Sequence, residues 1–368
     1  MLFPNLDLWL RVLLAIAVAL AVSFGTTPIV KVFAQKVGAM DVPDHKRHIH
    51  EHPTPRMGGM AIFLGFLISV LLFVEVTRPV QGILIGAVII VAVGVVDDIV
   101  SLRYWMKLIG QLLAAIVAVA HGVVIRFLMN PNVFSPETTV FFGSILPIPV
   151  TILWIVGVTN AVNLIDGLDG LACGVSAISS VTMLVAALLV AEPNVAVLLA
   201  ALAGGCLGFI PYNFNPAKIF MGDTGALLLG YVLATVSILG LFKFYAVVTF
   251  LAPVLALALP LFDTAFAIIR RLLKGQNPMT PDRGHLHHRL IDHGLSQKQA
   301  VAVLYSLSAM LGLTAVVICT TGKLRLLLLL VELGVAVAVG IFVYRTIEHP
   351  AREHRKPPEG SEDGEEKP

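Results

Sequence analysis

Residues 80–98 read VQGILIGAVIIVAVGVVDD, a nearly unbroken apolar run that ends in two aspartates. As a helix, about 20 apolar residues cross a bilayer core that is ~30 Å thick. Similar runs recur along the 368-residue chain, which is 57% hydrophobic and only 13% charged. Soluble domains carry about 25% charged residues, and these runs do not alternate as barrel strands do. The sequence therefore predicts an all-α polytopic membrane protein and excludes an ordinary soluble enzyme.

The apolar runs predict about eleven transmembrane helices. They cover residues 8–27, 57–76, 80–97, 107–127, 143–160, 171–191, 195–211, 224–240, 246–269, 299–318 and 323–344. Most of the 25 Lys and Arg residues fall in the loops after odd-numbered helices and in the tail. Because cytoplasmic loops carry the excess of basic residues, we expect the N-terminus outside and the C-terminus in the cytoplasm. We expect a transmembrane domain over 1–348 and a disordered cytoplasmic tail over 349–368.

Five polar clusters interrupt the apolar runs, and all five fall on the predicted cytoplasmic side. One is the pair Asp97–Asp98, which ends the third predicted helix. Two adjacent carboxylates at a bilayer boundary repel each other and are costly to desolvate. A divalent cation relieves both costs, and hard oxygen ligands suit Mg²⁺; a solvated helix cap is the structural alternative. Lys107 begins the next predicted helix near the same boundary.

A second cluster repeats a polar residue at every third position. It comprises Asn160, Asn163, Asp166 and Asp169, with Gly170 following. If the segment is helical, this spacing places the four side chains along one face. A purely structural role does not readily explain four such polar groups among apolar neighbours, so we predict a binding function for them.

The third cluster, residues 213–225, reads NFNPAKIFMGDTG. Its carboxylate, Asp223, is followed by Thr224 and lies between Gly222 and Gly225, three residues after Phe220. Glycines allow the close approach of a phosphate, the carboxylate suits a cation, and the aromatic ring suits a base. The segment predicts a corner of a nucleotide site.

Two basic clusters complete the set. Residues 44–59 hold four histidines and Arg56, and residues 283–289 read RGHLHHR. Arginine suits bidentate contact with phosphates, and histidine can donate to an oxyanion. Positive loops that only fix the topology are the alternative for both clusters. The four histidines of the first cluster lack a recognised metal-ligand spacing.

Three acidic residues fall within the predicted helices: Glu75, Asp263 and Glu332. Intramembrane carboxylates are functional candidates by default. Glu75 lies near an outer helix end, where its side chain can reach water. Asp263 precedes Arg270 by two helical turns and is a candidate for ordering the basic loop that follows. Glu332 has no evident partner in the sequence.

Carboxylates for a metal and basic loops for phosphates, placed together at a membrane face, point to phosphoryl transfer between a soluble donor and a lipid acceptor. Such catalysis consists mainly of positioning and charge neutralisation. The net charge of +2 gives no global basic field for nucleic acid.

The motifs of this chain resemble those of the polyprenyl-phosphate N-acetylhexosamine-1-phosphate transferase family, over roughly residues 30–295. They are PTPRMGG at 53–59, the pair Asp97–Asp98, NAVNLIDGLDGLA at 160–172, NPAKIFMGDTG at 215–225 and HLHHR at 285–289. The last motif resembles the branch that uses UDP-N-acetylglucosamine in making teichoic acid, O-antigen or enterobacterial common antigen.

The resemblance implies transfer of N-acetylglucosamine-1-phosphate from UDP-N-acetylglucosamine to undecaprenyl phosphate. Mg²⁺ is the expected cofactor, with Mn²⁺ as the alternative, and the expected place is the cytoplasmic face of a bacterial cell membrane. By motif, catalytic roles fall to Asp97, Asp98, Asp166, His287 and His288, metal ligation falls to Asp223 and Asp98, and binding falls to Lys107, Asn163, Asp169, Asn213, Phe220, Arg289 and Arg56.

Two alternatives remain open at this point. The peptidoglycan branch transfers phospho-N-acetylmuramoyl-pentapeptide, but it carries a different histidine loop and a lysine where this chain has Ser101. From another class, an anionic metabolite transporter would place its polar residues near the bilayer midplane and often shows inverted repeats. We see no such repeat. The oligomeric state is left open, with a homodimer as a candidate.

Overall fold

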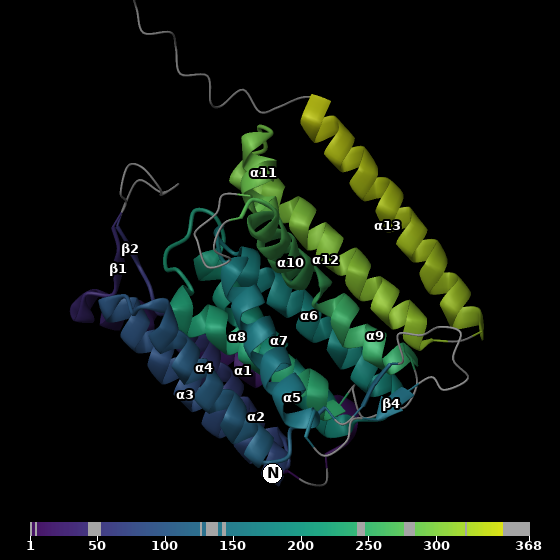
Figure 1. Ribbon diagram of the computed structural model, residues 1–368, viewed down its shortest axis with the longest axis horizontal. Coiled ribbons are helices and arrows are strands. Elements are labelled where there is room, and N and C mark those ends of the chain that lie inside the picture. Colours follow the sequence, from purple (N-terminus) through teal and green to yellow (C-terminus); the bar gives the residue numbers. More distant parts are fainter. Residues whose placement is uncertain are drawn as a thin grey trace, which may run out of the picture.

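The computed structural model describes residues 2–3, 6–42, 53–125, 127–129, 139–141, 145–240, 247–275, 284–320 and 322–348. Within these residues the chain is helical throughout, apart from two short hairpins (Figure 1). The N-terminal helices are α1 (Leu8–Val37), α2 (Gly59–Phe73), α3 (Arg78–Val100), α4 (Tyr104–Ala120) and α5 (Pro147–Leu164). The central helices are α6 (Leu171–Leu189), α7 (Pro193–Asn213) and α8 (Gly222–Gly240). The C-terminal helices are α9 (Val247–Ala256), α10 (Ala258–Leu273), α11 (Leu286–Asp292), α12 (Gln297–Cys319) and α13 (Gly322–Glu348).

The two hairpins are the departure from an all-helical chain. Strand β1 (Met40–Asp41) pairs antiparallel with β2 (Thr54–Pro55), and β3 (Phe127–Met129) pairs antiparallel with β4 (Thr139–Phe141). Pro53 and Pro55 keep the second strand extended. Both hairpins join helix ends, so they close loops and do not build a layer of the fold.

The chain is a polytopic membrane protein. Among the described residues, seven helices are long and apolar enough to cross a membrane: α1, α3, α5, α6, α7, α8 and α12. Helices α2 and α4 are apolar but shorter. Every apolar run predicted as a span carries a helix, and the run 246–269 is divided between α9 and α10. The count of about eleven spans and their orientation stay predictions.

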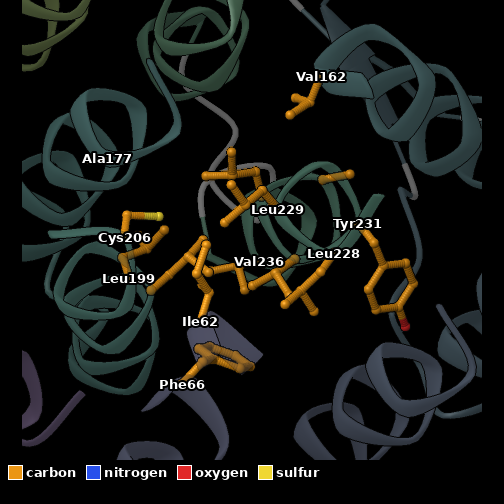
Figure 2. Packing of buried hydrophobic residues seen from close by; sticks show 14 of the residues in the cluster. Ile62, Phe66, Val162, Ala177, Leu199, Cys206, Leu228, Leu229, Tyr231 and Val236 are labelled. Carbon is orange, nitrogen blue, oxygen red and sulfur yellow. The ribbon is translucent and has the colours of Figure 1, made fainter. Parts of the chain in front are cut away.

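Helix α8 is the centre of the bundle. Every residue from Thr224 to Gly240 is buried, and α3 and α5 pack along it, with α2, α6 and α7 completing its surroundings. Figure 2 shows Leu228 and Val236 of α8 beside Ile62 and Phe66 of α2. The carboxyl-bearing start of α8 is therefore held by a rigid, fully surrounded helix.

The periphery of the bundle is built differently. Helix α13 packs against α12 and lies on the outside of the bundle (Figure 1). Large apolar side chains point away from the protein along this helix: Leu324, Leu326, Leu327, Leu329, Leu330 and Leu333. Because the lipid is as apolar as these side chains, such a surface is stable in a bilayer.

Glycines allow the central helices to approach closely. A Cβ on Gly94 of α3 would lie 2.4 Å from the Cα of Thr224, and one on Gly59 of α2 would lie 2.1 Å from the Cα of Gly225. Small residues at helix contacts are the usual means of close packing in membranes. These contacts bring the ends of α2 and α3 against the first turn of α8.

Candidate functional site

Three carboxylates from two helices meet at the start of α8. Asp97 and Asp98 come from the last turn of α3, and Asp223 comes from the first turn of α8. One ligand oxygen from each lies within 4.8 Å of the others. Asp97 and Asp98 are only 6% and 5% exposed, and Asp223 is half-buried. The predicted convergence of Asp97 and Asp223 is therefore present in the structure.

Lys107 of α4 lies between two of these carboxylates. Its Nζ donates to Oδ2 of Asp97 at 3.0 Å and to Oδ2 of Asp223 at 2.5 Å. The other oxygen of Asp97 accepts from the Leu102 N–H at 2.7 Å, which closes the turn between α3 and α4. The ammonium group thus links two helix ends 116 residues apart in sequence.

Asp98 holds the first turn of α8. Its Oδ1 accepts from the backbone N–H of Asp223 at 2.9 Å, and its Oδ2 accepts from the N–H and the hydroxyl of Thr224, at 3.2 and 2.6 Å. A carboxylate at a helix N-terminus satisfies the free N–H groups there and opposes the positive end of the dipole. Gly222, at φ 70°, leaves room for it, because a Cβ there would lie 2.4 Å from Oδ2 of Asp98.

The donor set of this centre fits a divalent cation. Three carboxylates offer hard oxygen ligands, as Mg²⁺ requires, and Lys107 is one positive charge against three negative ones. Asp98 already accepts three hydrogen bonds from α8. Each of the three carboxylates still offers a ligand oxygen, and Asp98 also holds Asp223 in place.

The polar triplet repeat is helical for half of its length. Helix α5 ends at Leu164, so Asn160 and Asn163 are on the helix, whereas Asp166 and Asp169 lie in the following turn. The four side chains therefore do not share one helix face. Asp169 accepts from Asn215 Nδ2 at 2.9 Å and from the N–H of Ala217 at 3.0 Å. This carboxylate ties the turn to the loop before α8.

Asp166 lies in the electrostatic field of the acidic centre, which is formed by Asp97, Asp98 and Asp223. Burial, followed by the negative charges of Asp223, Asp98 and Asp169, raises the pKa of the Asp166 carboxyl to about 8. A cation bound between Asp97 and Asp223 would act in the opposite direction and favour the ionised form. Asn163 is half-buried one helical turn earlier.

The segment 213–225 is anchored to the entry of α2. The N–H of Phe220 donates to the Pro55 carbonyl at 2.8 Å, and the N–H of Gly58 donates to the Phe220 carbonyl at 3.0 Å. Asn213 is buried and donates to the Ile219 carbonyl at 3.1 Å, so in this structure its amide closes the loop. Arg56 pairs with Asp41 of β1 at 3.0 Å.

The histidines of 285–289 lie against the turn that carries Asp166. A Cβ on Gly167 would lie 2.3 Å from Nε2 of His287, so a glycine is needed there for the imidazole to approach. His287 is 3% exposed. Burial, with a smaller effect of the neighbouring His288, lowers the pKa of His287 to about 4, so it is neutral at pH 7. Arg289 is exposed on α11.

Three supporting residues escaped the sequence analysis, and a fourth, Asp263, was predicted only to order the basic loop. Thr224 donates to Asp98, Gly94 admits Thr224, and Gln111 of α4 exchanges hydrogen bonds with Asn160 of α5 at 2.6 and 3.3 Å. Asp263 of α10 bonds to His285. Spacing gave a signal for two of them, since Gly94 precedes Asp98 by one turn and Gln111 follows Lys107 by one turn.

The structure also shows where the three acidic residues within the predicted helices lie. Asp263 does order the basic loop, as its position suggested. Glu332 of α13 accepts a hydrogen bond from the Thr314 hydroxyl of α12. Glu75 is exposed between α2 and α3. The histidine-rich residues 43–52, Arg283 and the predicted disordered tail lie outside the described residues.

Comparison with known proteins gives consistent matches. The family described as Glycosyl transferase family 4 matches residues 80–241. Over 312 residues the chain is 43% identical to the "Probable undecaprenyl-phosphate N-acetylglucosaminyl 1-phosphate transferase" of Bacillus subtilis (strain 168), covering 84% of this chain and 85% of that protein. It is 33% identical over 355 residues to the "Decaprenyl-phosphate N-acetylglucosaminephosphotransferase" of Mycolicibacterium smegmatis, covering 88% and 86%.

A third match comes from the other branch of the resemblance. The "Phospho-N-acetylmuramoyl-pentapeptide-transferase" of Heliobacterium modesticaldum is 36% identical over 203 residues, which cover 53% of this chain and 63% of that protein. The likeness to the N-acetylglucosaminyl proteins therefore extends over much more of the chain.

Proposed function

This chain belongs to glycosyl transferase family 4, and we propose that it transfers N-acetylglucosamine-1-phosphate from UDP-N-acetylglucosamine to undecaprenyl phosphate. The product is a lipid-linked first intermediate of a cell-envelope polysaccharide, and UMP is released. The observation that carries the proposal is the convergence of Asp97, Asp98 and Asp223 at the ends of membrane helices. A diphosphate donor needs charge neutralisation at the point where a lipid acceptor can reach it.

The aromatic residues at the start of α4 support a site at the membrane surface. Tyr104 and Trp105 are 67% and 46% exposed, three and two residues before Lys107. Tyrosine and tryptophan concentrate where the bilayer meets water. Exposed Ile109, Leu113 and Ile116 follow along α4, as expected of a lipid-facing surface. The acidic centre then lies level with phospholipid head groups, where the phosphate of the acceptor lies.

The excess of basic residues in one set of loops supports a cytoplasmic position for this surface, with the N-terminus outside. UDP-sugars are cytoplasmic metabolites, so the same orientation supplies the donor. The corresponding location is the cell membrane of a bacterium, in keeping with the bacterial sources of the relatives.

The proposed reaction is a displacement at phosphorus. An oxygen of the acceptor phosphate attacks the β-phosphorus of the donor, and the bond from that phosphorus to the bridging oxygen breaks with its electron pair remaining on UMP. A phosphate monoester has a second pKa of about 6, so most of the acceptor is already dianionic at pH 7. Asp97 would take up the remaining proton where the acceptor arrives singly charged.

The residues of the site divide these tasks. Asp223 and Asp98, with Asp97 beside them, would hold Mg²⁺, or Mn²⁺ as the alternative, and the bound ion would neutralise charge on the diphosphate. Lys107, whose ammonium group contacts Asp97 and Asp223, would then turn to a phosphate oxygen. Asp166, whose carboxyl feels the charges of Asp223 and Asp98, and Asn163 would bind the nucleotide and metal. Phe220 would offer its ring to the uracil, and His287, His288 and Arg289 would bind the sugar and diphosphate.

The test is UMP release by the purified protein in detergent. We expect release only when UDP-N-acetylglucosamine, undecaprenyl phosphate and Mg²⁺ are all present, and we expect a chelator to stop it reversibly. UDP-N-acetylmuramoyl-pentapeptide serves as the competing donor. Turnover of that donor alone would assign the peptidoglycan reaction, and uptake of a UDP-sugar into vesicles without UMP release would assign transport.

A further inference from the structure

Helix α10 binds the histidine segment, residues 284–289, through the buried carboxylate of Asp263. Oδ2 of Asp263 lies 2.8 Å from Nδ1 of His285, and Oδ1 accepts from the N–H of Leu286 at 2.9 Å. Asp263 and His285 are each 5% exposed. Both carboxylate oxygens are therefore directed to two consecutive residues, at the point where the chain enters α11, above α10 in Figure 1.

A second contact from the same helix fixes the preceding residue. Nη1 of Arg270 donates to the carbonyl of Gly284 at 2.8 Å, and a Cβ on Gly284 would lie 2.1 Å from the Arg270 guanidinium. Asp263 and Arg270, two turns apart on α10, thus bind three successive residues. This arrangement sets both the position and the direction of the segment.

The ring position of His285 affects the two histidines that are proposed to bind the donor. The rings of His285 and His287 stack at 5.8 Å between centroids with an interplanar angle of 9°, and His287 and His288 lie 4.3 Å apart. His287 in turn abuts Gly167 in the turn beside Asp166. A rotation of the His285 ring would therefore displace His287 from its place against Gly167.

We propose that Asp263 is a positioning residue for donor binding: it fixes the tautomer and ring orientation of His285, and through the stacked imidazoles it places His287 and His288. With the carboxylate accepting from Nδ1–H, Nε2 of His285 is left as an acceptor. Among the residues that the structure describes, this Nε2 has no hydrogen-bond partner. The inference rests on the proposed transferase function, because it concerns the affinity for the UDP-sugar.

Asp263→Asn separates this role from simple packing. The asparagine has the same shape, and its oxygen can still accept from the Leu286 N–H. Its NH₂ group then faces Nδ1 of His285, which can bond only if its own proton moves to Nε2. A purely structural carboxylate would tolerate the exchange of one hydrogen-bonded pair for another, whereas a tautomer-setting carboxylate would not.

The experiment measures UMP release against UDP-N-acetylglucosamine concentration for the parent protein, Asp263→Asn and Asp263→Ala. We expect Asp263→Asn to raise KM for the donor about tenfold or more, as removal of outer-shell partners does for metal-bound histidines. We expect kcat and the KM for undecaprenyl phosphate to change much less, and the thermal unfolding midpoint to stay near that of the parent. Glu332→Gln, which alters another hydrogen-bonded membrane carboxylate, is the matched control and leaves KM unchanged.

A double-mutant cycle tests the route through the neighbouring ring. If Asp263 acts by placing His287, then Asp263→Asn has little further effect on donor KM in a His287→Ala background. Fully additive effects would overturn the inference, and so would a parent-like KM in Asp263→Asn. An inactive parent protein would instead overturn the proposed function, so the two failures are distinguishable.

Discussion

The two halves of the site are held in place by different physical means. The acidic centre lies where α3 and α8 touch through glycine, and the backbone contact of Gly94 with Thr224 sets its geometry together with the hydrogen bonds of Asp98. The histidine segment is held by the side chains of Asp263 and Arg270 on α10. Backbone packing is stiff because a close-packed interior relaxes little. A few side-chain hydrogen bonds to charged groups, each worth about 1.5–3 kcal/mol net, hold a segment more loosely than backbone packing does.

The difference matches the tasks proposed for each half. Chemistry at phosphorus requires charges placed to within a fraction of an ångström, and this is what the buried start of α8 provides. Recognition of the sugar tolerates a segment that can shift as the donor enters and leaves. Changes in the acidic centre should therefore affect turnover, and changes around α10 should affect donor affinity.

The largest loss of activity should come from replacing Asp97 or Asp223, the two carboxylates that Lys107 contacts. Asp223→Ala and Asp97→Asn each remove a carboxylate charge from the centre, so we expect UMP release to fall at least about 1,000-fold. The folded protein should survive, because Lys107 keeps one carboxylate partner in either variant. Thermal unfolding in detergent checks folding, and Glu332→Gln is the activity control. Near-parent turnover in either variant would remove these residues from the metal site.

The next effect tests the packing that places those carboxylates. Gly94→Ala puts a Cβ 2.4 Å from the Cα of Thr224, where backbone and not a flexible side chain must give way. We expect a loss of about 1–3 kcal/mol, the usual cost of overpacking. Gly25→Ala in α1 is the matched control, because nothing lies within 4 Å of the added methyl group. The unfolding midpoint should fall only for Gly94→Ala, and equal midpoints would contradict the close contact.

A smaller, pH-dependent effect probes the histidine segment. The pKa of His287 is lowered to about 4 in the folded protein, against about 6.5 for an unfolded histidine. Between these values the unfolded chain binds the proton and the folded chain does not. The stability present at pH 7 is therefore lost as the pH falls from about 6.5 to about 4, by up to about 1.4 kcal/mol per pH unit.

His287→Gln removes the titrating group and should flatten this dependence. We expect the unfolding midpoint of the parent to fall more between pH 7 and pH 5 than that of the variant. The comparison of slopes isolates His287 from the other histidines, which both proteins share. Parallel slopes would mean that His287 is accessible to protons in the folded state.

Much of the fold followed from the sequence because lipid leaves little choice. A run of about 20 apolar residues must satisfy its backbone within a helix, and every predicted run carries one. The pairing of Asp97 with Asp223 was likewise predictable, since motifs at helix ends on one membrane face can only meet there. The end of α5 at Leu164 was harder to predict. A polar residue at every third position suits a helix and a turn equally well, and only the backbone positions of Gly167 and Gly170 decide between them.

The bonding partners of Asp263 and Tyr305 could not be found from the sequence, for a different reason. The bond from Asp263 to His285 spans 22 residues, and that from Tyr305 to Gly170 spans 135. Neither pair carries a local spacing signal, because each depends on which helices become neighbours. Side-chain partners between distant helices are a product of packing, and they appear only when α10 and α12 are placed against the turn at 165–170.

The smallest effect concerns a side chain of α12 that bonds to the turn between α5 and α6. Tyr305 of α12 donates its hydroxyl to the Gly170 carbonyl at 2.5 Å, and its ring packs against Gly174 of α6. Tyr305→Phe keeps the ring and removes one hydrogen bond, so we expect a loss of about 0.5–1.5 kcal/mol and less than a tenfold fall in UMP release. Tyr104→Phe, at an exposed hydroxyl of α4, should leave both unchanged. The turn keeps its second anchor, Asp169 to Asn215 and Ala217; a fall well beyond tenfold would mean that this anchor does not hold it, and that α12 positions Asp166 by itself.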